Sequence, residues 1–158
     1  MENLKPIISA HPFFKDLAPE HLDTIAGCAR NAVYQPGEFI FKEGENANEF
    51  FLLRFGKVAL EIYIPHVGGV TIQTIEEGSV FGWSWIFPPY RWHYDARALE
   101  LTRTLVMDGQ CLREKIEKDK VLGYELMRRF AQVMKDRLEA TRLQLVDIYK
   151  NPQAVKHS

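Results

Sequence analysis

Short runs of β-branched and aromatic residues alternate with glycines through the middle of the chain, from Phe39 to Leu105. Runs of this length, separated by turn residues at fairly even spacing, are typical of a small antiparallel sandwich or roll and not of a parallel α/β sheet. The clearest predicted strands are residues 50–53, 57–64, 70–75, 94–99 and 102–107. The middle of the chain is therefore expected to be all β.

Helical periodicity flanks this β region on both sides. Apolar residues recur at helical spacing after Pro19, which predicts a short amphipathic helix over residues 19–29. On the C-terminal side, Asp108 is a candidate N-cap for a helix over residues 110–118. A much longer helix, without an internal proline, is expected over residues 121–150.

The long C-terminal helix would extend about 45 Å, which is more than one small domain covers. We therefore expect the chain to have three parts: a β-roll with N-terminal helices over residues 1–120, a dimerisation helix over 121–150 and a flexible tail over 151–158. Seven of its residues step alternately by four and three, as a heptad seam does, and predict a parallel homodimer. The alternative is that they cover an intramolecular core. The seam residues are Met127, Ala131, Met134, Leu138, Thr141, Leu145 and Ile148.

Charge and hydropathy argue against several classes of partner. The chain has 20 basic and 21 acidic residues, so no overall field attracts it to nucleic acid or to an anionic membrane. No segment approaches the roughly 18 uncharged apolar residues that span a bilayer, and we expect a cytoplasmic protein. Cys28 and Cys111 lie far apart in sequence and lack metal-ligand spacing. We therefore expect two reduced, buried thiols, with no disulfide and no metal site.

Five glycines at predicted tight turns carry a resemblance to a known family. They are Gly37, Gly44, Gly56, Gly78 and Gly82, and the accompanying segments read HPFFKDLAPEHLDTIAG and YQPGEFIFKEGENANEFFLLRFGKVAL. From about His11 to Lys135 the chain resembles the cyclic nucleotide-binding domains of catabolite-activator-type regulators, kinase regulatory subunits and gated channels. The resemblance implies an antiparallel β-roll of the jelly-roll type, followed by a long helix, and a regulatory role. The fold alone does not name a ligand.

In that family the ligand is held by a phosphate-binding cassette, and this sequence departs from the cassette at two positions. A Phe-Gly-Glu tripeptide opens a short helix whose amides face the cyclic phosphate, the glutamate binds the ribose 2′-hydroxyl, and an arginine on the next strand pairs with the phosphate. Here Phe81 and Gly82 match, but Trp83 stands at the glutamate position and Trp92 at the arginine position. Arg91 lies one residue away, which in a strand is the opposite face, so it replaces the arginine only if the register shifts.

All three tryptophans of the chain lie in this segment, together with several other aromatic residues. Three interpretations are open. The rings fill the former pocket and extend the core, they line a remodelled pocket for a different planar or apolar ligand, or they form an exposed patch that binds a protein. The candidate pocket residues are Phe81, Gly82, Trp83, Ser84, Trp85, Arg91, Trp92 and His93.

The sequence shows no recognisable nucleophile with a base, paired carboxylates or metal-ligand spacing, so we expect no catalytic residue, no metal and no cofactor. As an alternative, the single imidazole of His93 would hold a haem iron. Eight residues follow Lys150, too few for a helix-turn-helix, so no direct DNA binding is expected.

The predicted function is a non-catalytic ligand-sensing or regulatory module, with a non-standard ligand or none, that contacts an unidentified protein partner. The alternatives are a genuine binder of cyclic AMP or cyclic GMP and a ligand-free interaction domain.

Overall fold

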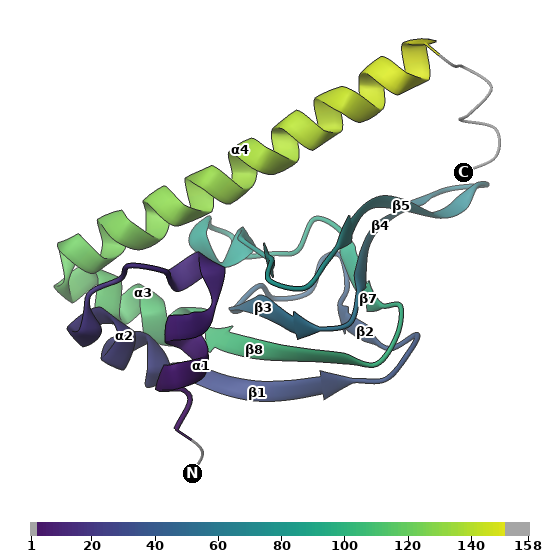
Figure 1. The fold of residues 1–158 in the computed structure, drawn as a ribbon. Helices are drawn as coiled ribbons and strands as arrows, with labels where there is room; N and C mark the ends of the chain where they lie inside the picture. Colours follow the sequence, from purple (N-terminus) through teal and green to yellow (C-terminus); the bar gives the residue numbers. More distant parts are fainter. Residues whose placement is uncertain (1–2, 151–158) are drawn as a thin grey trace. The chain divides into compact units, whose positions relative to one another are not determined.

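The computed structural model describes residues 3–150, so the tail predicted over residues 151–158 lies outside the described residues. The chain divides into two compact units between Leu122 and Gly123. The first unit contains two antiparallel sheets and the shorter helices, and the second contains most of one long helix (Figure 1).

Eight strands make up the two sheets of the described chain. One sheet has the strand order β1-β8-β3-β6 and the other has the order β2-β7-β4-β5, with antiparallel pairing throughout. Several neighbours in each sheet are far apart in sequence, which is the pattern of a roll, and the predicted antiparallel β-roll is confirmed. The strands are β1 Ala29–Tyr34, β2 Phe39–Phe41, β3 Glu49–Phe55, β4 Val58–Ile64, β5 Gly68–Ile75, β6 Val80–Phe81, β7 Asp95–Ala98 and β8 Thr102–Asp108.

Helices α1, α2 and α3 lie at one end of the sheet that contains β1, β8 and β3 (Figure 1). The Asp108 carboxylate accepts a hydrogen bond of 3.0 Å from the backbone N–H of Cys111, which confirms the predicted N-cap of α3. The helix predicted over residues 19–29 ends earlier because Ala29 begins β1, whose backbone pairs with β8. The helices are α1 Lys5–Ala10, the 3₁₀ helix η1 Pro12–Phe14, α2 Pro19–Ala26, the 3₁₀ helix η2 Ser84–Ile86, α3 Gly109–Lys118 and α4 Lys120–Lys150.

Strand β3 lies inside its sheet and is buried on both faces. Phe51 and Leu53 point into the space between the two sheets, where they join the main core. Phe50 points to the other side, and its ring centroid lies 6.2 Å from that of Phe13 in η1. The hydrophobic core between the sheets is formed by Phe41, Ala47, Phe51, Leu53, Val58, Leu60, Ile75, Phe81, Trp92, Ala96 and Val106.

The five glycines of the family resemblance all have positive φ angles, between 83° and 99°. Gly56 shows why such a position excludes other residues, because a Cβ there would lie 2.5 Å from the carbonyl oxygen of Leu101. Both the backbone conformation and the available space therefore favour glycine at this turn.

The second unit is formed by α4 from Gly123 onwards. Its surface is crossed by pairs of opposite charge one turn apart, with Glu125 to Arg129 at 3.8 Å and Lys135 to Glu139 at 3.7 Å. Pairs with this spacing support a solvated helix by a few tenths of a kcal/mol each, about 0.2–0.5. In the part of the chain that the structure describes, we find no helix with the length and apolar character needed to cross a membrane.

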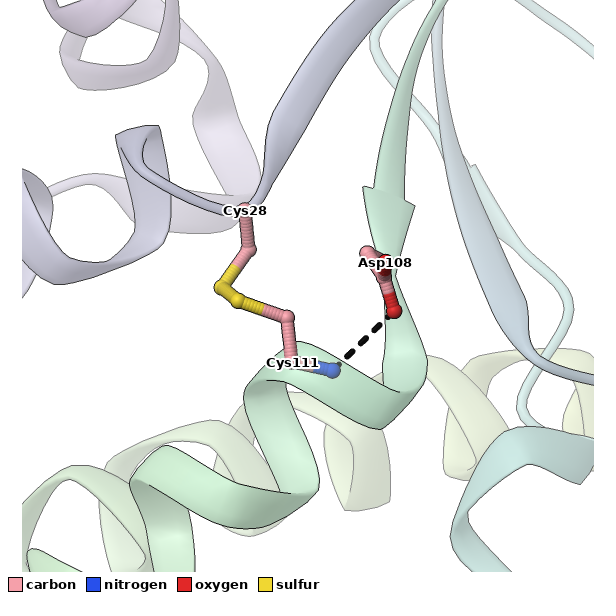
Figure 2. Close-up of a disulfide and its surroundings, with 3 residues drawn as sticks. All are labelled: Cys28, Asp108 and Cys111. Atoms are coloured by element: carbon pink, nitrogen blue, oxygen red, sulfur yellow. Dashed lines mark hydrogen bonds between the residues drawn. A yellow bond between two sulfur atoms is a disulfide. The ribbon is translucent and has the colours of Figure 1, made fainter.

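The two cysteines correct the sequence prediction. Cys28 and Cys111 form a disulfide, with Cα atoms 5.8 Å apart although 83 residues separate them in sequence (Figure 2). The prediction of two reduced thiols was wrong because sequence distance says nothing about proximity here. Pairing of Ala29 with Met107 at the end of the β1–β8 ladder brings the turn after α2 beside the first turn of α3.

Candidate functional site

The candidate cassette residues lie on the segment that leaves β6, passes through η2 and joins β7. Beyond η2 this segment runs antiparallel to the turn that precedes β3. The N–H of Ala47 donates to the Tyr90 carbonyl at 2.7 Å, and the N–H of Trp92 donates to the Glu45 carbonyl at 3.1 Å. These bonds hold the segment extended, so that successive side chains point to opposite sides.

Trp92 lies inside the roll with 3% of its surface exposed. Its ring stacks on that of Phe41, with centroids 3.8 Å apart and planes 11° apart. Phe51 and Phe81 stack beside this pair at 4.9 Å. A Cβ on Gly82 would lie 2.9 Å from the indole ring, so the bare backbone of this glycine leaves the space that the ring occupies. The position of the family's phosphate-binding arginine therefore carries a ring that is part of the core.

Trp83, at the family's glutamate position, directly precedes η2 and is half-buried, while Ser84 is buried. The N–H groups of Ile86 and Phe87 donate to the carbonyls of Trp83 and Ser84, at 3.1 and 3.3 Å. The amides of Ile86 and Phe87 are therefore bonded within the turn itself. The indole of Trp83 has a single N–H donor and no acceptor comparable to a carboxylate, so it cannot accept from a ribose hydroxyl as glutamate does.

Trp85 is buried on the side of β3 that faces away from the roll interior. Its ring stacks on Phe50, with centroids 5.3 Å apart. Arg113 of α3 donates to the Trp85 carbonyl at 2.7 Å, and its guanidinium lies 4.2 Å from the centre of the Tyr90 ring. Arg113 thus fixes the cassette segment against α3 through a hydrogen bond and a cation–π contact. Sequence reasoning missed this residue, since a basic residue on an amphipathic helix carries no distinctive signal.

Arg91 and His93 flank Trp92 and are both exposed. The guanidinium of Arg91 donates to the Gly44 carbonyl at 3.2 Å, and its backbone forms an isolated bridge with Asn46. Since Trp92 points inward, its two neighbours point outward. The structure therefore does not bring Arg91 to the position of the phosphate-binding arginine.

The aromatic residues of the segment do not form one cluster. Phe81 and Trp92 lie in the core between the sheets, Trp85 lies on the other face of β3, and Phe87 is 54% exposed. The helical turn of η2 breaks the two-residue alternation that a strand would have kept. The packing of Phe81 and Trp92 fits the interpretation in which rings fill the former pocket.

A basic side chain beside this region, that of Arg97, is already paired. Arg97 of β7 makes two hydrogen bonds to the Glu61 carboxylate on β4, at 2.6 and 3.3 Å. This bonding raises the pKa of Arg97 above its ordinary value. Ala96 and Ala98 are fully buried, so Arg97 between them points outward from the core. Its charge is balanced by Glu61 on that outer face.

Two cavities lie away from the candidate cassette. One, of about 460 Å³, lies at the junction of α2, β1 and α3, and the other, of about 450 Å³, lies beside His11 and Leu53. Neither is lined by residues 81–94. Across residues 3–150, no group of three or more His, Cys, Asp and Glu side chains is arranged to hold a metal ion.

The two-sheet roll with its cassette segment and long C-terminal helix defines a class of small regulatory domains. The sequence model of the cyclic nucleotide-binding domain matches residues 32–119, more than half of the chain. This protein belongs to the cyclic nucleotide-binding domain family, as the turn glycines predicted.

Solved structures in the same class extend the comparison. A cyclic nucleotide-binding protein of Geobacter metallireducens GS-15 is 30% identical, with a TM-score of 0.78 over 87% of this chain and 99% of that one. A cyclic nucleotide-binding domain from Methylobacillus flagellatus KT is 17% identical, with a TM-score of 0.76 over 91% and 81%. The catabolite activator protein of Thermus thermophilus is 24% identical, with a TM-score of 0.66 over 87% and 63%. The last two similarities concern the fold alone.

Among curated proteins, the human, mouse and rat cGMP-dependent protein kinases 2 are each 29% identical over 82 residues. The match spans 51% of this chain but only 11% of the length of each kinase. The similarity therefore covers one domain-sized part of a much longer enzyme.

Proposed function

We propose that this protein is a cytoplasmic, non-catalytic regulatory module of the cyclic nucleotide-binding domain family whose cassette holds a non-standard ligand or none. The observation that carries the proposal is the burial of Trp92, which stacks flat on Phe41 in the core where the family places an arginine. Cyclic AMP and cyclic GMP are expected to bind in the millimolar range at best.

The magnitude follows from the two missing charged contacts. A hydrogen bond to a charged group contributes about 1.5–3 kcal/mol. This chain has tryptophans, Trp83 and Trp92, at the two positions where the family has the glutamate and the arginine. Their loss costs about 3–6 kcal/mol, which corresponds to a hundredfold to ten-thousandfold weaker binding. Opening the site would also separate Trp92 from Phe41 and expose both rings to water, which weakens binding further.

Isothermal titration with cyclic AMP and cyclic GMP tests this proposal. We expect no saturable heat at micromolar nucleotide with the wild type, and measurable binding with Trp83→Glu/Trp92→Arg. Phe87→Arg serves as the matched control, because it adds a positive charge to the same segment at an exposed position. Micromolar binding by the wild type would reject the proposal in favour of a genuine cyclic-nucleotide binder.

Self-association is the second part of the proposal. On α4 the seam residues Ala131, Leu138, Thr141, Leu145 and Ile148 are exposed, with Leu138 at 54% and Leu145 at 50%. A parallel two-fold dimer of this helix would cover the same stripe on both copies. The occupant we propose for the seam is therefore a second copy of the chain.

Light scattering at tens of micromolar distinguishes the dimer from a monomer. Leu138→Glu should shift the protein to monomer, because it places charges opposite each other in the seam. Leu143→Glu is the matched control: Leu143 is 67% exposed on the same helix but lies outside the heptad seam, so the dimer should persist. A wild type that is monomeric at this concentration would refute the dimer and leave a heterologous protein partner as the use of the seam.

A further inference from the structure

The Cys28–Cys111 disulfide joins the turn after α2 to the first turn of α3 and borders a cavity that the proposed function does not use (Figure 2). We infer that this bond is a thiol–disulfide exchange site in the folded protein, reduced by a small dithiol that enters the cavity and re-formed by exchange with a small disulfide. The inference is independent of whether the cassette holds a nucleotide.

The cavity gives a reductant access to the bond. Its volume is about 460 Å³, and both cysteines are among the residues that line it. Cys28 is buried, with 7% exposed, whereas Cys111 is half-buried. Asn46 and Gln110, which also line the cavity, are exposed to solvent. Cys111 is therefore the cysteine that an incoming thiolate would reach first.

The walls of the cavity are suited to a polar reactant. Arg30 and Glu49 form an ion pair at 2.5 Å along one wall, and the Asp108 carboxylate lies along another. Charged and polar groups keep such a space wet, and thiolates react from water. A disulfide sealed in an apolar core would lack this access.

The exchange balances in two steps. The thiolate of the dithiol attacks Cys111 Sγ, forming a mixed disulfide and releasing the thiolate of Cys28, which takes up a proton. The second thiol of the dithiol, as its thiolate, then attacks the dithiol sulfur that is bonded to Cys111 Sγ. This closes the dithiol's own disulfide and releases the thiolate of Cys111, which takes up a proton. Overall the dithiol is oxidised to its disulfide, and two electrons and two protons pass to Cys28 and Cys111.

The surrounding backbone keeps the two cysteines near each other after reduction, which makes the exchange reversible. The backbone N–H of Asp108 donates to the Cys28 carbonyl at 2.8 Å, and the adjoining pair Ala29 and Met107 belongs to the β1–β8 ladder. None of these bonds depends on the sulfur atoms. An oxidant can therefore re-form the bond without a search through unfolded states.

Reduction would remove the covalent tie between the first turn of α3 and the turn after α2. The disulfide holds the first turn of α3. At the other end of this helix, His21 Nε2 of α2 lies 3.2 Å from the Asp119 carboxylate, and Asp119 alone separates α3 from α4 in sequence. The redox state of Cys28 and Cys111 thus sets how firmly the helix that leads into α4 is held.

The expected compartment gives this site a use. We expect a cytoplasmic protein, and cytoplasmic thiol buffers keep most cysteine pairs reduced. Disulfides that do form there are usually transient and catalytic or redox-sensing. An accessible, reversible bond at the first turn of α3, the helix that precedes the seam helix, fits that behaviour.

The test is the rate at which dithiothreitol reduces the full-length protein, followed by alkylation of free thiols and mass measurement. We expect a rate that rises in proportion to the dithiothreitol concentration and stays flat from 0 to about 1 M urea. After dithiothreitol is removed, we expect full recovery of the bond in excess oxidised glutathione. A rate that climbs with urea as steeply as global unfolding does would overturn the inference. So would two free thiols that persist in excess oxidised glutathione after dithiothreitol is removed.

Two variants of one cavity residue test the path of entry. Gln110→Trp narrows the opening and should slow reduction at least tenfold, whereas Gln110→Ala should stay within twofold of the wild type. Circular dichroism checks that both remain folded, and equal rates in both would overturn entry through this cavity.

Hydrogen exchange should then show at least tenfold less protection in α3 of the reduced wild type, with β3 unchanged. Unchanged protection in α3 would overturn the role of the bond in holding that helix.

Discussion

The cassette segment and the α2–α3 junction fill space in opposite ways within the same β-roll. At the cassette, where the family has a ligand pocket, Trp92 and Phe41 stack in the core. Gly82 has no Cβ, and the indole occupies the space where one would lie. At the junction a cavity remains, and a covalent bond between Cys28 and Cys111 holds its sides together. The cassette should therefore respond to changes in side-chain volume, and the junction to changes in redox state.

The largest expected effect comes from emptying the cassette. Trp92→Ala should lower the free energy of unfolding by about 3–5 kcal/mol, because it removes a large buried ring and leaves a cavity. Urea unfolding at 25 °C measures the change. Phe87→Ala, at an exposed position of the same segment, should stay within about 0.5 kcal/mol of the wild type. Equal losses in both variants would contradict the contrast between a filled cassette and a solvated loop.

Breaking the covalent bond at the junction should have the next largest effect. Cys28→Ser/Cys111→Ser should lower the free energy of unfolding by about 2–4 kcal/mol, because the unfolded chain gains freedom when a long loop is opened. Combined with Trp92→Ala, the two losses should add to within about 0.5 kcal/mol if the regions are independent. A large non-additive term, measured by the same urea titration, would show that cassette and junction share one packing unit.

A pH titration probes the N-terminal segment around His11. His11 is 7% exposed, its Nδ1 accepts from the N–H of Phe13, and burial lowers its pKa from 6.5 to about 4, partly offset by the Leu53 carbonyl. The unfolded chain takes up this proton below pH 6.5 and the folded one does not. The free energy of unfolding should thus fall by about 2 kcal/mol between pH 6.5 and about 4.

The comparison for that titration is His11→Asn, which keeps a side-chain acceptor for the Phe13 N–H but does not titrate. The fall in its free energy of unfolding between pH 6.5 and about 4 should be smaller than that of the wild type by the contribution of His11. If the wild type and the variant have parallel pH profiles, the histidine is not buried in its neutral form.

The smallest effect tests the helix cap beside the disulfide. Asp108→Ala should lower the free energy of unfolding by about 1 kcal/mol, because the first turn of α3 loses an acceptor for the Cys111 N–H. Asp108→Asn keeps an acceptor and should lie close to the wild type in thermal unfolding. A loss in the asparagine variant as large as in the alanine variant would assign the effect to charge and not to capping.

Much of the fold was predictable because its signals are local. The run predicted as residues 57–64 became β4, Val58–Ile64, since turn glycines bound it on both sides. β6 is only two residues long, too short for any alternation to show. β1 lies at the edge of its sheet and carries the polar residues Arg30 and Asn31 after Ala29. These elements depend on their partners β3 and β8, which a local pattern does not contain.

The site was predictable in part for the same reason. Side-chain alternation along an extended segment gave the opposite orientations of Arg91 and Trp92. Trp85, predicted as a candidate pocket residue, instead follows the start of η2 and lies on the far face of β3, where its ring stacks on Phe50. The disulfide could not be predicted from the sequence, since only the β1–β8 register brings Cys28 and Cys111 together.

The span of the disulfide also changes what happens when the chain is cut. Residues 28–111 contain all eight strands, so the bond turns the roll into a covalent ring from which the N-terminal and C-terminal helices emerge at one point. A protease that nicks the turn between β4 and β5, where Val67 is 70% exposed, would leave one molecule of unchanged mass apart from an added water. The two fragments would separate on a gel only after reduction.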